Sequence, residues 1–237
     1  MQNFVFRRRE QKYLLNEMQK AALIQAVGEK LQPDDYGRSL VCNIYFDTPD
    51  YRLIRRSLEG SVYKEKLRLR GYGSIGQGDK VFLEMKKKYD GIVYKRRVKL
   101  PVEQAMVYMA DPEAQLDKGQ IGRELDYFKK YYPGLRPTMY LSYDRLAWKL
   151  DDLRITLDWN VCYRMDRLDL TVPPDGDQLL EPGQYLLEIK TASAMPLWLV
   201  EVLDRNQIRK QSFSKYGKAY LRLLQENTIE SRGNQYV

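Results

Sequence analysis

The segment KEKLRLRGYG, residues 64–73, places a cation at every second position. Successive side chains of a β-strand point to opposite faces. A strand here therefore carries a row of cations on one face and mainly leucine on the other. The four cations are Lys64, Lys66, Arg68 and Arg70. Because like charges on one face repel, we expect a strongly negative partner to lie against this row.

The same alternation recurs in other strand-like segments of the chain. Their polar faces together hold fourteen cations but only four anions. The cations are Arg8, Lys12, Lys64, Lys66, Arg68, Arg70, Lys86, Lys88, Lys95, Arg97, Lys99, Arg145, Arg154 and Lys190. The anions are Glu10, Glu84, Asp158 and Glu188. An open antiparallel sheet with its charged face in water explains any single strand, but solvated surfaces usually mix charges of both signs.

Eight segments have the composition and alternation of strands, which is enough to close a barrel. They span residues 4–13, 40–46, 62–70, 81–88, 92–100, 139–150, 153–161 and 185–190. In a closed barrel the charged faces point inward and form a cationic tunnel. Its natural guest is a linear chain of phosphates, because Arg and Lys bind phosphate through charge-assisted hydrogen bonds. Glu84 and Glu188, each in the middle of a strand, are the best placed to act as counter-ions or metal ligands.

Helical patterns interrupt the strands and predict an α+β fold, with amphipathic helices packed on the outside of an eight-stranded antiparallel barrel. The expected helices span residues 16–31, 102–110, 122–132, 195–206 and 215–227. Asn16 is expected to cap the first helix together with Gln19. No linker is evident, so we predict one domain over residues 1–225, followed by a polar tail over residues 226–237.

Composition restricts the chemistry. The net charge of +8 favours polyanionic partners, such as nucleic acid, anionic membrane or phosphate-rich molecules. The absence of histidine excludes His-based triads and His metal ligands, so any metal needs oxygen ligands, which suits magnesium or manganese. Cys42 and Cys162 indicate neither a disulfide framework nor a zinc site, which fits the cytoplasm. We expect no signal peptide and no membrane span.

Other signals have plainer explanations. GYGSIG at 71–76 lies between two strands with no helix after it, which favours a hairpin loop over a dinucleotide site. KKK at 86–88 resembles a nucleic-acid patch, but in a strand Lys87 faces away from its neighbours. The tyrosines are expected to pack rather than to stack bases. The apolar segment 195–203 is expected to cover the barrel rather than to bind a membrane or partner.

Eight segments in order resemble the polyphosphate polymerase domain of the vacuolar transporter chaperone (VTC) family, within the CYTH-like superfamily of triphosphate tunnel metalloenzymes. They are EQKY, LRLRGYG, FLEMKKK, YKRRV, SYDRLAW, LRITLD, LLEIK and SFSKYGKAY. The superfamily often has E-x-E-x-K in its first strand. Here Arg8 replaces the first glutamate, and only Glu10 and Lys12 remain. This departure resembles the polymerase branch more than the triphosphatase or cyclase branches.

The resemblance implies roles for individual residues. Phosphate-gripping or catalytic roles are implied for Lys12, Arg68, Arg70, Lys86, Lys95, Arg145, Arg154 and Lys215. Further substrate contacts are expected from Lys66, Lys88, Arg97, Lys190, Ser214 and Tyr143. Glu188 is expected to hold Mn²⁺ or Mg²⁺, with Glu84 and Glu10 as further candidates.

The reaction that the resemblance implies is transfer of the γ-phosphate of ATP to a growing polyphosphate chain. ATP and inorganic polyphosphate are then the partners. No nucleic acid is expected, and a separate membrane partner stays possible. A module that binds polyphosphate without turnover and a tunnel triphosphatase are the alternatives. Nucleic-acid binding on an open basic sheet is a fourth interpretation.

Overall fold

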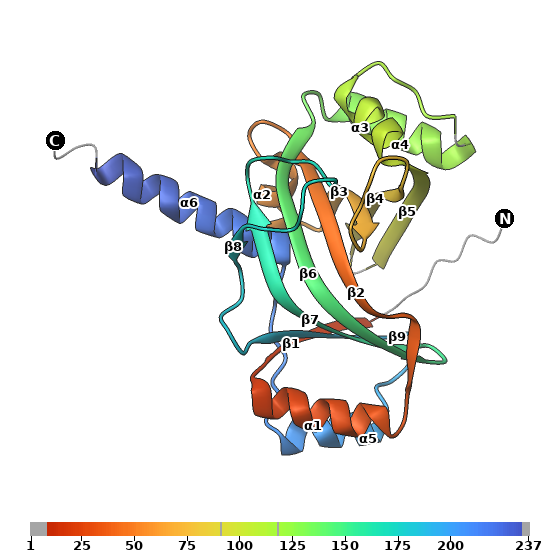
Figure 1. The fold of residues 1–237 in the computed structure, drawn as a ribbon, viewed down its shortest axis with the longest axis vertical. Helices are drawn as coiled ribbons and strands as arrows, with labels where there is room; N and C mark the ends of the chain where they lie inside the picture. The colour runs from red at the N-terminus through yellow and green to blue at the C-terminus, as the bar shows by residue number, and fades with distance from the viewer. Residues whose placement is uncertain (1–8, 91, 118, 234–237) are drawn as a thin grey trace.

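The computed structural model describes residues 9–90, 92–117 and 119–233, and a strongly curved antiparallel sheet dominates it (Figure 1). Its strand order is β1-β9-β7-β6-β2-β3-β4-β5, and the short β8 pairs with β7. The strands are β1 Arg9–Leu15, β2 Gln32–Asp47, β3 Tyr63–Tyr72, β4 Lys80–Tyr89, β5 Ile92–Pro101, β6 Arg136–Leu150, β7 Leu153–Arg164, β8 Asp177–Gln178 and β9 Tyr185–Thr191. The predicted α+β fold with one large antiparallel sheet is confirmed, and each predicted strand corresponds to one of the long strands.

Several boundaries differ from the prediction. Strand β2 begins at Gln32 rather than Leu40, and β8 was not predicted. Residues 4–8 of the first predicted strand, including Arg8, lie outside the described residues. As predicted, GYGSIG lies where β3 turns towards β4, and Lys87 points away from the charged face, 3.7 Å from Glu65.

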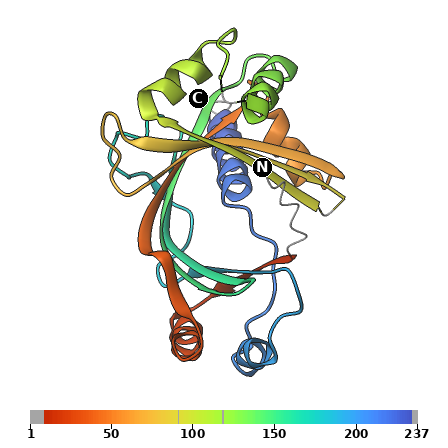
Figure 2. The same cartoon turned by 90° about the vertical axis from the view of Figure 1, so that its right-hand side faces the viewer.

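The closed barrel was wrong in one respect, because no ladder of the described strands joins the edge strands β1 and β5. The curved sheet is open on that side (Figure 2). The free edge of β1 is covered instead by the chain segment before the last helix. Tyr13 bridges to Lys210, and the Gln211 N–H donates to the Lys12 carbonyl at 2.9 Å. We call residues 209–214 the strap.

Two apolar clusters cover the convex face of the sheet, as the amphipathic helices predicted. Helices α1 Glu17–Gly28 and α5 Leu197–Arg205 pack over β1, β7 and β9. Helices α3 Val102–Ala110 and α4 Gly119–Tyr131 pack over β3, β4 and β5. The Asn16–Gln19 capping box of α1 is confirmed. None of the described helices has the length and apolar character needed to cross a membrane.

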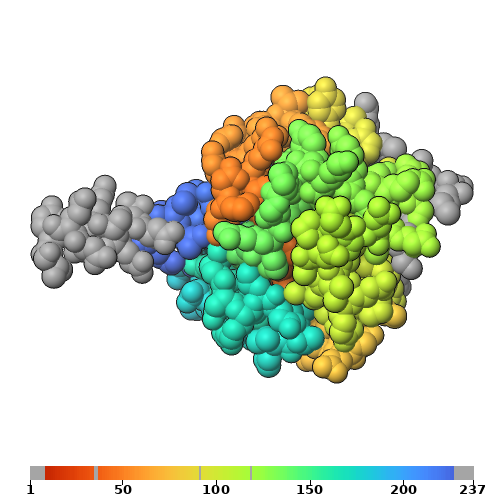
Figure 3. All heavy atoms as spheres, turned by 90° about the horizontal axis from the view of Figure 1, so that it is seen from above, coloured from red at the N-terminus to blue at the C-terminus, as the bar shows by residue number. Residues whose placement is uncertain are grey.

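The last helix departs from the expected outside position. Helix α6, Lys215–Gly233, begins against the concave face and then projects from one side of the sheet (Figures 1 and 3). Its Tyr216 ring stacks on Tyr45 of β2 at 4.4 Å. The reason is local composition, since Met139 and Leu141 make this part of the concave face apolar. The helix also continues past residue 226, where the polar tail was predicted to begin.

Helix α2, Arg52–Leu58, was not predicted, and a buried carboxylate holds it in place. Asp47 is fully buried and accepts hydrogen bonds from the N–H groups of Leu53 at 2.8 Å and Ile54 at 3.0 Å. It also accepts one from the Tyr216 hydroxyl at 3.0 Å. Asp47 therefore joins the start of α2 to α6. In the sequence, Asp47 directly after an apolar strand could have indicated a helix cap, but α2 is too short for its helical pattern to stand out.

We expect Asp47→Ala to lower the free energy of unfolding by about 3 kcal/mol, because several buried donors lose their acceptor. Urea denaturation measures this loss. Asp50→Ala is the matched control, since Asp50 is exposed and the donors that bind Asp47 stay paired, while among buried donors only the Thr48 hydroxyl loses its bond to Asp50. Equal destabilisation by both substitutions contradicts the anchoring role of Asp47.

Candidate functional site

The concave face gathers charged side chains from strands that are far apart in sequence. Strand register sets Lys66 of β3 beside Lys86 of β4, and Lys86 beside Lys95 of β5. On the other wall, Arg145 of β6 lies beside Asp158 of β7, and Thr156 beside Glu188 of β9. The alternation in the sequence therefore becomes one continuous, mostly cationic surface inside the curved sheet.

Glu84 neutralises one group of these cations. Its side chain is 2% exposed and lies 2.8 Å from Arg68, 3.9 Å from Arg70 and 2.5 Å from Lys95. Burial alone would raise the pKa of Glu84, but Arg68, Arg70 and Lys95 hold that pKa well below its usual range. Glu84 is therefore ionised and engaged by cations on both sides, which is the environment of a counter-ion.

Asp158 does the same for a second group. It is fully buried, and Arg145 binds it through two hydrogen bonds of 2.6 and 2.8 Å. Lys215, the first residue of α6, binds the same carboxylate. Asp158 thus fixes the Arg145 guanidinium and ties α6 to the concave face. The sequence placed Asp158 on the charged face but gave it no function.

Glu10 and Glu188 form a third, more accessible acidic group on β1 and β9. Lys12 lies 3.3 Å from Glu10 and 3.6 Å from Glu188, and Lys190 lies 2.5 Å from Glu188. Lys86 reaches Glu10 at 3.6 Å from β4. This contact connects the two walls of the tunnel on its open side. Burial opposes ionisation of Glu188, but Lys190 and Lys12 keep its pKa well below the usual range.

The donor set of Glu10 and Glu188 fits a hard divalent cation better than Glu84 does. Carboxylate oxygen is what Mg²⁺ prefers, and phosphate oxygens commonly supply further ligands. Within the described residues no group of three or more His, Cys, Asp and Glu gathers as a metal site. Phosphate and water would therefore complete the coordination. Glu84 is less suited, because its side chain is 2% exposed, whereas those of Glu188 and Glu10 are 11% and 28% exposed.

Lys66 lies deep in the concave face at the start of α6. Its ammonium donates to the Ser214 hydroxyl at 3.0 Å. Burial lowers the pKa of Lys66 to about 8, and the neighbouring cations Lys86, Lys12 and Arg68 lower it in the same direction. Burial also lowers the pKa of Lys95 to about 8, although Glu84 opposes the change. Burial is thus the main cause of both shifts, and neighbouring cations add to it.

Two polar side chains of β2 also belong to the site, and sequence reasoning missed both. Asn43 is fully buried and accepts a hydrogen bond from Arg70 at 2.9 Å. Tyr45 accepts one from Arg68 at 3.1 Å. Burial would raise the pKa of Tyr45, but Arg68, Lys66 and Arg70 lower it to about 8. Asn43 and Tyr45 are two positions apart in an otherwise apolar strand and so share one face, and this spacing could have identified them as site residues.

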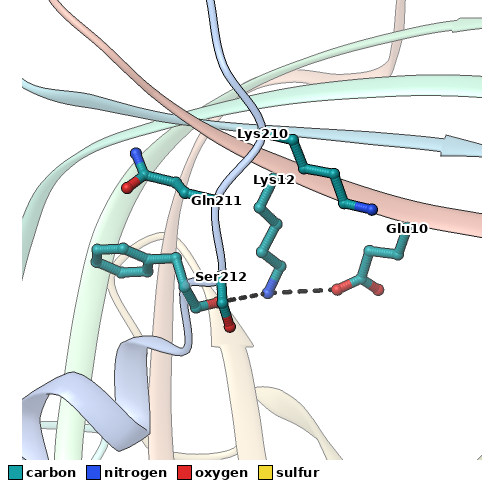
Figure 4. Close-up of a pocket in the computed structure, with 6 residues that line it drawn as sticks. Glu10, Lys12, Lys210, Gln211 and Ser212 are labelled. Atoms are coloured by element: carbon teal, nitrogen blue, oxygen red, sulfur yellow. Dashed lines mark hydrogen bonds and ion pairs between the residues drawn. The ribbon is translucent and has the colours of Figure 1, made fainter.

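Other predicted residues take different positions. Arg70 also donates to the Tyr143 hydroxyl at 3.0 Å. Arg154 is paired with Asp34 at 2.7 Å and is partly exposed. Lys88 and Arg97 are exposed, and Arg97 lies over the Phe82 ring. The strap closes over Lys12, which donates to the Phe213 carbonyl at 2.9 Å. Glu10, Lys12 and the strap line a cavity of about 400 Å³ there (Figure 4).

Comparisons with known proteins identify the family and the fold of the chain. The VTC domain matches residues 7–224, nearly the whole chain. The chain belongs to the VTC domain family. No curated protein is significantly similar to it in sequence.

One of two similar solved structures shares the fold of this VTC domain, and the other is more distantly similar. A Bacillus halodurans protein described as a candidate adenylate cyclase has a TM-score of 0.57 and 18% identity, over 86% of this chain and 92% of that one. A Hippeastrum protein described as a candidate adenylyl cyclase with a dominant triphosphatase activity has a TM-score of 0.48 and 17% identity, over 87% and 92%. The predicted VTC family is confirmed by the family match, and the Bacillus halodurans structure shares the fold.

We expect a polyanion to bind the cationic concave face more weakly as the pH rises from 7.5 to 9.5, and ATP serves as the probe. The triphosphate is nearly fully ionised at pH 7.5 and loses no negative charge above it, whereas Lys66 and Lys95 lose positive charge above their pKa values of about 8 and Tyr45 gains negative charge. Calorimetric titration of ATP in EDTA measures the change without turnover.

Lys66→Met and Lys95→Met should each flatten this pH profile, because each removes one titrating cation. Lys130→Met is the control, since Lys130 is exposed on α4, which covers the convex face. An affinity that stays constant up to pH 9.5 in the unsubstituted protein contradicts the electrostatic picture.

Proposed function

We propose that the protein is a metal-dependent polyphosphate polymerase that transfers the γ-phosphate of ATP to a polyphosphate chain held in the tunnel. The observation that carries this proposal is the excess of cations on the concave face. The carboxylates that lie among them are Glu10, Glu84, Asp158 and Glu188, and Asp34 pairs with Arg154 at the rim. The paired cations alone outnumber these acids, and they are Lys12, Arg68, Arg70, Lys86, Lys95, Arg145, Arg154, Lys190 and Lys215.

The arginines supply fixed phosphate-binding groups. Arg68 and Arg145 each make two hydrogen bonds to a buried carboxylate, so their guanidinium planes are oriented before any phosphate arrives. Preorganised donors stabilise the charge that builds up during phosphoryl transfer. Lys12, Lys86 and Lys190 surround the Glu10–Glu188 pair, where we place the donor triphosphate.

A divalent cation held by Glu188 and Glu10 would neutralise charge on that triphosphate. In the proposed transfer, the bond from the γ-phosphorus to the β,γ-bridging oxygen breaks and ADP leaves. A terminal oxygen of the polyphosphate chain forms the new bond to phosphorus. This oxygen is already anionic, so the acceptor needs no general base. That requirement fits a chain without histidine, in which alignment and charge neutralisation replace proton transfer.

We place this activity in the cytoplasm, because Cys42 and Cys162 are both free thiols, as expected in a reducing compartment.

The reaction itself is tested by incubating the protein with ATP and Mn²⁺, with and without a short polyphosphate primer. Gel electrophoresis and phosphorus NMR resolve the products. We expect long chains and an equivalent release of ADP. Orthophosphate as the sole product would identify a triphosphatase instead. Binding of tripolyphosphate without turnover would identify a receptor for phosphate chains.

We expect Glu188→Gln to lower Mn²⁺-dependent turnover at least about a hundredfold, because each electrostatic group of this kind contributes roughly 10²–10³. Tripolyphosphate should still bind, since the substitution removes a negative charge from the tunnel. Steady-state kinetics at varied Mn²⁺ and calorimetry measure the two effects.

Glu84→Gln is the matched control, with a different expected result. It leaves Arg68, Arg70 and Lys95 without their counter-ion, so thermal unfolding should occur at a lower temperature and tripolyphosphate should restore part of the loss. The apparent affinity for Mn²⁺ should stay unchanged. Normal Mn²⁺ dependence in Glu188→Gln would remove Glu188 from the metal site.

A further inference from the structure

Phe82 is an aromatic residue in a row of charges. It precedes Glu84 by two positions on β4 and lies beside Arg70 of β3, so it shares the concave face with both. Of the phenylalanines that the structure describes, Phe82 alone lies outside the three buried apolar clusters. Its side chain is half-buried. A core-packing role therefore does not explain it.

Aromatic and cationic groups from the two neighbouring strands, β3 and β5, surround Phe82. The Arg97 guanidinium of β5 lies 4.7 Å from the ring centroid, and the Lys99 ammonium lies 5.9 Å from it. Tyr72 of β3 meets the ring edge-on, with centroids 6.1 Å apart. Arg97 and Lys99 are exposed, and none of the ion pairs between described residues includes Arg97. A planar guanidinium backed by an aromatic ring is thus presented to solvent.

We propose that Phe82, Arg97 and Tyr72 form a platform that binds the nucleobase of the donor nucleotide. The inference rests on the proposed function, which makes ATP the donor. Stacking on aromatic rings and on guanidinium planes is how proteins bind bases without strict sequence preference. Lys99 beside the platform would contact the ribose or the α-phosphate. The platform makes a nucleoside triphosphate, rather than free triphosphate, the preferred ligand.

The spacing along β4 supports this assignment. Phe82 and Lys86 are four residues apart, which is about 13 Å at roughly 3.3 Å per residue. Lys86 contacts Glu10, where we place the donor triphosphate. The separation matches the span of a triphosphate and ribose. Tyr72 ends β3 next to the hairpin loop, so the platform lies at the opposite end of the β3–β4 wall from Lys66 and α6. The base would therefore lie at one mouth while the phosphates point inward.

The test compares two ligands that differ by the nucleoside. Calorimetry with Mn²⁺ measures binding of β,γ-imido-ATP and of tripolyphosphate to Phe82→Leu, Phe82→Tyr and the unsubstituted protein. We expect Phe82→Leu to weaken β,γ-imido-ATP roughly tenfold, as loss of one base–aromatic stack does. Tripolyphosphate should change less than about twofold, since no phosphate contact is lost. Phe82→Tyr keeps the ring and should bind both ligands normally. Tyr89→Leu, an exposed position at the far end of β4, is the control and should change neither.

The outcomes separate the inference from the proposed function. If neither ligand binds the unsubstituted protein, the proposed function fails and the platform with it. If tripolyphosphate binds but Phe82→Leu leaves β,γ-imido-ATP unchanged, only the platform is overturned. Equal weakening of both ligands also overturns it, because the substitution then acts through the phosphate sites. Melting curves establish that each variant is folded.

Discussion

The pairing of clustered cations with two buried carboxylates is the constraint on which the site depends. Arg68, Arg70 and Lys95 repel one another, and Glu84 among them makes their proximity tolerable. Asp158 does the same for Arg145 and Lys215. Buried ion pairs contribute little net stability, but losing one member leaves an uncompensated charge and is costly. The acids therefore fix the position of the cations more than they stabilise the fold, and enough cations remain to attract a polyanion.

The position of helix α6 depends on the same charges and on the buried carboxylate of Asp47. Lys215 binds Asp158, and Ser214 accepts from Lys66, so the start of α6 is held by groups of the tunnel itself. Asp47 joins the helix to α2 from the side. This arrangement couples the apolar end of the concave face to the charged part. Phosphate that competes for Lys66 acts directly on a residue that holds α6.

The open side of the sheet gives the site its asymmetry. The strap covers the edge of β1, and Lys12 is held by the Phe213 carbonyl as well as by Glu10 and Glu188. On the opposite edge strand, β5, the side chain of Lys95 is 43% exposed, and Arg97 and Lys99 are exposed as well. The Glu10–Glu188 pair lies between these edges. Because Lys86 of β4 reaches Glu10, the proposed donor phosphates lie between the Glu10–Glu188 pair on β1 and β9 and the β4 strand that carries Phe82.

Much of this protein follows from its sequence. Alternation with a period of two predicted eight strands, because side chains of a strand point in only two directions. The same alternation predicted that their shared face is mostly positive. The capping box at Asn16 and the apolar periodicity located the outer helices. The tertiary structure alone decided which acid serves which cation, because register between strands such as β6 and β7 sets those distances. It also decided that the barrel stays open and that α6 enters the concave face. Both depend on contacts between residues far apart in the chain, such as Tyr13 with Lys210 and Tyr45 with Tyr216, which no local pattern records.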